Sequence, residues 1–277
     1  MVVTLKNKSI VRKLPVFLSI CAVLIILLSV AFYDGLVTRH YTLVSPFTEN
    51  EHTYVVITDL HSTYYGKNQE KLVNKINDAA PEAIFLIGDI SEDRRPFDGT
   101  AALLSQITKQ YPCYYVTGNH ERWVNYTDNI KRHFEEHGVT VLDGDGVDLG
   151  DGIRLHGIDD PLFFDSDMEF SSALDDLSPS DNTFDILLSH RPEYAKMYTA
   201  LGFDLTLCGH AHGGQVRIPF ILNGLYAPHQ GFFPEFAGGE YEIDSRHVIV
   251  SRGLMIDDLP RIFNPPELLV IKVDGEN

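Results

Sequence analysis

The sequence predicts an α/β layered domain that follows one N-terminal membrane-spanning helix. Residues 14–33 are predominantly apolar and contain no charged side chain. Beyond them, between residues 54 and 137, short apolar runs typical of buried strands alternate with stretches of helical periodicity. Because 44% of the 277 residues are apolar, the chain can bury a full core, which excludes a disordered protein.

The apolar segment 14–33 is long enough to cross a membrane. Twenty helical residues, at a rise of about 1.5 Å each, span a hydrocarbon core of about 30 Å. A cleaved signal peptide is the alternative, since Ser29-Val30-Ala31 offers small residues for cleavage, but its apolar region is usually shorter. We therefore expect an uncleaved anchor.

Basic residues on one side of this segment predict its orientation. Lys6, Lys8, Arg12 and Lys13 precede it, which favours a cytoplasmic N-terminus and an extracytoplasmic domain in a single-pass protein of the cell membrane. We accordingly divide the chain into four parts. These are a basic cytoplasmic segment (1–13), the transmembrane anchor (14–33), a tether with an edge strand (34–50) and the folded domain (51–277).

The folded part of the chain is strongly acidic. The formal charge is −17 overall, and residues 41–277 alone carry −21. Such a surface repels a phosphate backbone, so we expect no nucleic-acid partner. Three cysteines provide no disulfide framework, and Cys113 and Cys208 lie in predicted buried strands.

Apolar patterning places the individual elements. Buried strands are expected at 54–58, 83–87, 114–116, 153–156, 184–188 and 204–207. Helices are expected near 72–80, 101–108 and 128–137. The C-terminal third predicts strands at 216–218, 240–243, 248–250 and 268–273. Residues 161–182 and 219–239 are irregular and rich in Phe, Pro and Gly, which predicts loops over a site.

Five of the predicted strands end in potential metal ligands. In chain order these residues are Asp59 and His61, Asp89, Asn119 and His120, His190, and His210 with His212. Any one of them has an ordinary alternative, such as a helix cap, a turn residue or a satisfied core polar group. Their joint occurrence at strand ends favours a metal site, because ligands of open α/β sheets bind at the carboxyl ends of strands.

The ligand types indicate the kind of metal site. Oxygen and imidazole ligands without thiolates suit Mn²⁺, Fe or Zn²⁺, and the set is large enough for two ions that share one carboxylate. Two ions about 3.5–4 Å apart can clamp the attacking and leaving oxygens of a displacement at phosphorus, with a bridging hydroxide as nucleophile. His120, beside Asn119, is placed to stabilise the transition state or to protonate the leaving oxygen.

The ordered motifs Asp-x-His, Gly-Asp, Gly-Asn-His-Glu, a lone His and Gly-His-x-His resemble the calcineurin-like metallophosphoesterase superfamily over about residues 52–273. The resemblance implies a four-layer αββα sandwich with a dinuclear centre holding two divalent ions, for which we expect Mn²⁺, with Fe or Zn²⁺ as alternatives. It also implies the role of each residue. Asp59, His61 and His212 hold one ion, Asp89 bridges, Asn119, His190 and His210 hold the other, and His120 is catalytic.

Two further stretches, Gly-His-Ala-His-Gly-Gly-Gln at 209–215 and residues 259–267, resemble the YkuE/YaeI-type branch of membrane-associated phosphodiesterases. We therefore expect a phosphodiesterase acting on a small-molecule or lipid-linked phosphoester. Two alternatives stay open: a pyrophosphatase or phosphomonoesterase acting on a nucleotide-sugar lipid, and a non-catalytic surface-binding protein. Five loop aromatics either meet acyl chains or lie in the core: Phe163, Phe164, Phe232, Phe233 and Phe236.

Overall fold

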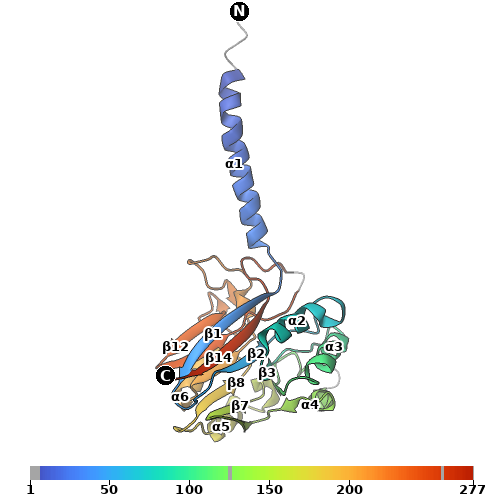
Figure 1. Ribbon diagram of the computed structural model, residues 1–277, viewed down its shortest axis with the longest axis vertical. Helices are drawn as coiled ribbons and strands as arrows, with labels where there is room; N and C mark the ends of the chain where they lie inside the picture. Colours follow the sequence, from blue (N-terminus) through green and yellow to red (C-terminus); the bar gives the residue numbers. More distant parts are fainter. Residues whose placement is uncertain (1–6, 124–126, 257–258, 277) are drawn as a thin grey trace, which may run out of the picture.

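Two six-stranded sheets pack face to face in the computed structural model, which describes residues 7–123, 127–256 and 259–276 (Figure 1). The first sheet consists, in spatial order, of β1 (Val37–Ser45), β14 (Glu267–Gly275), β2 (His52–Ile57), β3 (Ala83–Ile87), β4 (Cys113–Val116) and β5 (Thr140–Val141). The second consists of β12 (Gly239–Ile243), β13 (Arg246–Val250), β9 (Leu205–Cys208), β8 (Phe184–Leu188), β7 (Ile153–Gly157) and β6 (Asp145–Gly150).

The central strands of both sheets are parallel. In the first sheet, β2, β3, β4 and β5 run parallel, and β14 is antiparallel to β2. In the second, β7, β8, β9 and β13 run parallel, with β6 and β12 antiparallel at the edges. Because parallel strands end at the same edge, the loops that follow them gather at one end of each sheet.

Apolar side chains hold the sheets together. Val56, Phe85 and Ile87 of the first sheet share a buried cluster with Ile186 and Leu207 of the second. Every residue of β3 and of β8 is buried, since both faces of each sheet are covered. Such strands are mostly apolar instead of alternating, with Asp185 the charged exception in these two, which explains why they were recognisable as apolar runs.

Helices cover the two outer faces. On the first sheet these are α2 (Glu70–Ala79), α3 (Asp98–Ile107) and α4 (Thr127–Glu136), and on the second α5 (Asp167–Asp176) and α6 (Ala195–Leu201). Leu72, Val73 and Ile76 form the buried stripe of α2, at the spacing of one helix face. The expected four-layer αββα sandwich is therefore present.

The remaining elements are short. They are η1 (Lys67–Gln69), η2 (Pro161–Phe163), η3 (Pro192–Tyr194), η4 (His212–Gly214), β10 (Tyr226–Ala227) and β11 (Gly231–Phe232). The predicted loop 219–239 contains the two-residue strands β10 and β11, and its last residue begins β12.

Two expectations about secondary structure were wrong. Residues 216–218 form isolated bridges to Ile262 and Leu222 in place of a strand. The predicted loop 161–182 contains helix α5, whose first turn is capped by Ser166, the side chain accepting a hydrogen bond from the amide of Glu169. A short capped helix with only two buried residues gives a weak apolar pattern, so its aromatic and proline-rich flanks dominated the prediction.

The N-terminal helix α1 (Asn7–Ala31) projects away from the domain (Figure 1). It contains one stretch, Lys13–Ala31, that is long and apolar enough to cross a membrane. The predicted span 14–33 thus lies in this helix except for its last two residues. The predicted edge strand is β1, which pairs with β14 over nine residues, so residues 37–45 pack with the domain.

Some of the five loop phenylalanines lie in the core and others are exposed. Phe164 and Phe236 pack in the cluster on the outer face of the second sheet. Phe232 and Phe233 are 71% and 69% exposed, and Phe163 is half-buried. The core explanation therefore holds for two of them, and the exposed pair is available for other contacts.

Candidate metal centre

The strand ends bring all eight predicted site residues to one edge of the sandwich. The first sheet provides Asp59 and His61 after β2, Asp89 after β3, and Asn119 and His120 after β4. The second provides His190 after β8 and His210 and His212 after β9. Each side chain thus comes from a loop that a buried parallel strand holds in place.

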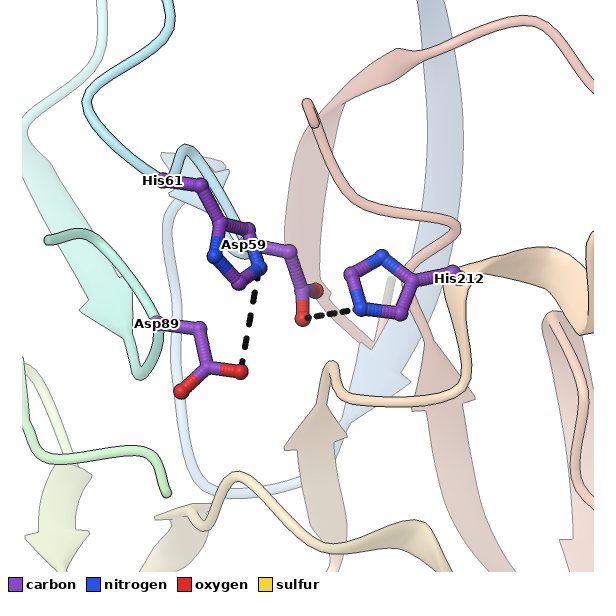
Figure 2. A group of neighbouring side chains, drawn as sticks. All are labelled: Asp59, His61, Asp89 and His212. Carbon is purple, nitrogen blue, oxygen red and sulfur yellow. Dashed lines mark ion pairs between the residues drawn. The ribbon is translucent and has the colours of Figure 1, made fainter. Parts of the chain in front are cut away.

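The side chains form two groups that share one carboxylate. Ligand atoms of Asp59, His61, Asp89 and His212 lie within 4.8 Å of one another, and Figure 2 shows these side chains turned toward one another. Asp89 forms a second group, with the same limit, together with His190 and His210. The arrangement can therefore hold two cations on either side of Asp89.

Asn119 and His120 lie beside these groups. The Asn119 side chain is buried, and its Oδ1 has no hydrogen-bond partner among the described residues. The His120 amide donates a 2.7 Å hydrogen bond to Asp89 Oδ1, and its ring stands edge-on to His61 with 4.6 Å between the ring centroids. His120 is thus held against the shared carboxylate.

The backbone of the centre is strained. Five of the eight residues have positive φ angles, between 47° and 66°: Asp59, His61, Asp89, His210 and His212. Such conformations are uncommon for residues other than glycine and cluster at functional sites. Neighbouring glycines make room for them: a Cβ atom on Gly253 would lie 2.6 Å from the Cβ of Asp59, and one on Gly209 2.6 Å from its Oδ2.

Unpaired buried atoms test whether the residues fit a metal. In the centre, the buried atoms that have no hydrogen-bond partner among the described residues include Asn119 Oδ1, His61 Nε2 and His210 Nδ1. A buried polar atom without a partner is costly, and groups of this kind are expected where an ion binds. Oxygen and imidazole donors without thiolates fit the divalent ions expected from the sequence.

The second-sheet histidines are oriented by their neighbours. His190 Nδ1 lies 3.0 Å from the carbonyl oxygen of Ile87, at the end of β3, while His190 Nε2 faces Asp89 Oδ2 at 3.1 Å. The amide of His210 donates to the Asp59 carboxylate at 3.0 Å. The contacts of the two His190 ring nitrogens fix that ring's orientation and proton position, whereas the His210 contact holds its backbone against Asp59.

Burial and charge together set the protonation of the centre. Burial acts to raise the pKa of Asp89, but His190 and His61 hold it well below its usual range. Burial acts to lower the pKa of His190, yet Asp89 raises it to about 10. Burial lowers the pKa of His212 to about 4, so that this ring is neutral at pH 7, the form that binds metal.

A sequence model of the calcineurin-like phosphoesterase family matches residues 52–214, more than half of the chain. The chain belongs to this family. The match begins at the first residue of β2 and ends at the last residue of η4, so it contains every residue of the candidate metal centre.

Relatives place the phosphoesterase within the family. It is 30% identical to the uncharacterised metallophosphoesterase YkuE of Bacillus subtilis, over 80% of this chain and 79% of that protein. It is 26% identical to the phosphodiesterase YaeI of Escherichia coli, over 63% of each chain. A bovine transmembrane protein with a metallophosphoesterase domain is 28% identical over 78% of this chain and 51% of its own length. The predicted branch is thereby confirmed.

Sequence reasoning gave no role to Glu121, which organises the phosphoesterase's centre. Its carboxylate accepts hydrogen bonds of 2.8–3.0 Å from four backbone amides, those of Asp89, Ile90, Ser91 and Gly118. Burial, and next the charge of Asp89, raise the pKa of Glu121 to about 7. Its place directly after His120 in the Gly-Asn-His-Glu motif was the available signal.

A second missed group surrounds Arg191, which directly follows His190. Its guanidinium donates to Asp160 at 2.5 Å and lies 2.7 Å from His229 Nδ1 and 3.4 Å from His210 Nε2. His229 comes from the predicted loop 219–239, and its Nδ1 is 3.0 Å from His210. Nothing in the sequence pattern distinguishes His229 from a surface histidine. The irregular composition of its loop was the one sequence signal that this segment lies near the site.

Proposed function

We propose that the chain is a metal-dependent phosphodiesterase with a dinuclear centre. The observation that carries the proposal is the shared carboxylate: Asp89 belongs to both groups of ligand atoms. Two ions held by groups that share this carboxylate would stabilise the attacking and leaving oxygens of a displacement at phosphorus. The name of the YaeI relative supports a diester as the substrate.

We assign the ligands as the motifs imply. Asp59, His61, Asp89 and His212 would hold one ion. The second would be held by Asp89, Asn119, His190 and His210. We propose Mn²⁺ for both positions, with Fe or Zn²⁺ as alternatives, because imidazole and carboxylate ligands suit all three.

When bound, such ions activate water for attack on phosphorus and neutralise phosphate charge. The chain's own residues then position the ester. Burial lowers the pKa of His120, although Asp89 opposes this effect, so its ring is mainly neutral at pH 7. A neutral imidazole donates one N–H, which favours stabilisation of the developing charge on oxygen over full proton transfer.

We further propose that α1 anchors the enzyme in a membrane, with the N-terminus in the cytoplasm and the catalytic domain outside. The apolar stretch Lys13–Ala31 and the bovine transmembrane relative support the anchor. The basic residues before it support the orientation. Residues 34–50 would connect the anchor to a domain whose boundary we place at residue 51, with β1 docked on its edge.

The deciding experiment uses the full chain purified in a neutral detergent. Metal content is measured first, and then the rates on bis-p-nitrophenyl phosphate and p-nitrophenyl phosphate after chelation and Mn²⁺ addition. We expect two ions per chain and faster cleavage of the diester. His247→Ala is the matched control, because this half-exposed histidine pairs with Glu240, outside the groups of candidate ligands.

Other results would change the assignment. Two ions with preference for the monoester would retain the centre and change the substrate class from a phosphodiester to a phosphomonoester. A folded protein that binds no metal and turns over neither substrate would leave a non-catalytic binding protein.

A further inference from the structure

A cavity of about 600 Å³ lies outside the metal centre and is lined by three arginines, Arg39, Arg217 and Arg252. Its apolar lining includes Phe220, Ile221 and Phe263. A basic cavity stands out on this chain, since residues 41–277 carry a formal charge of −21. The combination of cations and apolar side chains is the chemistry that recognises an amphiphilic anion.

The cavity keeps an excess of positive charge. The buried carboxylate of Glu267 lies 2.7 Å from Arg39 Nε and 3.5 Å from Arg252 Nε. Arg217 instead donates to two neutral oxygens, the carbonyl of Gly213 and the side chain of Asn223. Among the ion pairs of the described residues, one carboxylate thus serves two of the three guanidinium groups, and Arg217 pairs with none.

The arginines repel one another. Burial, and next the positive charge of Arg252, lower the pKa of Arg217 to about 10. Burial also lowers the pKa of Arg252, with Glu267 opposing and Arg39 adding to the effect. An anion bound among them would relieve this repulsion, as phosphate does when it binds paired guanidinium groups.

The cavity lies where α1 joins the domain. The amide of Phe263, one of its lining residues, donates a 2.7 Å hydrogen bond to the carbonyl of Ala31, the last residue of α1. Figure 1 shows loops of the C-terminal third at the end of the domain from which α1 departs. If α1 spans a membrane as proposed above, this wall of the cavity lies at the membrane surface.

An exposed apolar tip borders the same cavity. The Phe220 side chain is fully exposed, and Ile221 is 82% exposed. Neighbouring apolar residues at a loop tip are costly in water but stable among acyl chains at a membrane interface. The lining of this cavity therefore places apolar side chains beside cationic ones.

We propose that this cavity binds the phosphate headgroup of an anionic membrane lipid, with Phe220 and Ile221 among the adjacent acyl chains. The proposal rests on the membrane position of α1 proposed above. It assigns the lipid to a site distinct from the ligand set of the metal centre. The bound lipid would hold an otherwise acidic domain close to an anionic surface that repels it.

Native mass spectrometry of the full chain in neutral detergent tests the proposal. The protein is mixed with equal amounts of phosphatidylglycerol and phosphatidylcholine, and the retained lipids are counted. We expect the wild-type protein to retain phosphatidylglycerol in preference to phosphatidylcholine. The double variant Arg217→Gln/Arg252→Gln removes two basic side chains near the membrane surface, and it should reduce this preference about 30-fold. Phe220→Ser/Ile221→Ser should also reduce retention. Arg132→Gln, an exposed arginine on α4, is the matched control.

Two results would overturn the proposal. One is an unchanged lipid preference in both double variants. The other is a combination of two findings: saturating inorganic phosphate abolishes the wild-type preference for phosphatidylglycerol, and Phe220→Ser/Ile221→Ser leaves lipid retention unchanged. Together they would show that the cavity binds a soluble anion instead of a lipid. Should the arginine variant fail to fold, the exposed Phe220 and Ile221 variant decides alone.

Parallel measurements separate this proposal from the earlier ones. Metal content and bis-p-nitrophenyl phosphate turnover report the metal centre, and alkaline carbonate extraction reports the anchoring of α1. Because Arg217 also contacts Gly213 beside His212, turnover of its variant is not used as a lipid readout.

Discussion

Asp89 is the residue on which the proposed centre depends, because it contributes to both groups of ligand atoms. Asp89→Asn keeps the size of the side chain but removes its charge and leaves one neutral oxygen as donor. We expect both ions to be lost together, with metal content falling from two per chain to well below one. Metal analysis after gel filtration measures this, and His247→Ala is its control. Loss of a single ion would disprove the bridging role.

His120 has a different role from the ligands, so its removal should separate chemistry from binding. His120→Ala should lower kcat on bis-p-nitrophenyl phosphate by about 10²–10³-fold, the usual cost of removing one donor that stabilises developing charge. Metal content should stay at the wild-type value, since the contact of residue 120 with Asp89 is made by the backbone amide. Unchanged turnover would contradict the catalytic assignment.

At the residue scale, the sequence identified candidate ligands but not what orients them. Asp59, Asp89 and His190 were recognisable because each lies two residues beyond the end of a buried strand, in a motif of fixed order. Glu121 acts through four backbone amides, and Arg191 through contacts with loops distant in sequence. Interactions between loops depend on how the loops fold over one another, which no local pattern encodes.

At the scale of elements, His52 links the two sheets through polar contacts. This β2 residue lies between Glu82, at 2.8 Å from Nδ1, and Asp151, at 2.9 Å from Nε2. Asp151 belongs to the turn between β6 and β7 of the second sheet, and it also accepts a hydrogen bond from Thr48. A ring with a carboxylate on each nitrogen is most stable when doubly protonated.

His52 should therefore give the protein a pH-dependent stability. Burial acts to lower its pKa, but the hydrogen bonds to Asp151 and Glu82 raise it above the usual 6.5. A raised pKa means that the stabilisation is complete below pH 6.5 and is lost as the pH rises through the folded-state value. His52→Gln should lower the melting temperature most at about pH 5.5 and least at about pH 9. A constant difference would show that the carboxylates do not hold a charged ring.

The elements differ in how far the sequence determined them. Strands β2, β3, β8 and β9 were predictable because strands buried on both faces form continuous apolar runs. The pairing of β1 with β14 was not, since it joins segments more than 200 residues apart and depends on the whole sheet. Helix α5 was missed because its apolar periodicity is weak. Its capping residue, Ser166, lies in a segment whose composition is typical of a loop.

For the molecule as a whole, the net charge could be calculated from the sequence, whereas the number of layers could not be predicted from its residue pattern. Strand–helix alternation indicated an α/β protein, while the four layers came only from the family resemblance. The charge of −21 over residues 41–277 follows directly from composition. It does not reveal the arginine cavity, because Arg39, Arg217 and Arg252 come from separate segments.

The orientation that we propose for the molecule in a membrane rests on the charges that flank α1. Lys6, Lys8, Arg12 and Lys13 precede the apolar segment 14–33, and Asp34 is the first charged residue after it. Basic flanks stay in the cytoplasm, so the domain should lie outside. We expect a protease added to intact cells to remove the domain from the membrane fraction, as followed by an antibody to its C-terminus, while a cytoplasmic marker protein stays uncut. A domain that is cut only after cell lysis would place it inside, and the catalytic centre would then act on cytoplasmic phosphoesters.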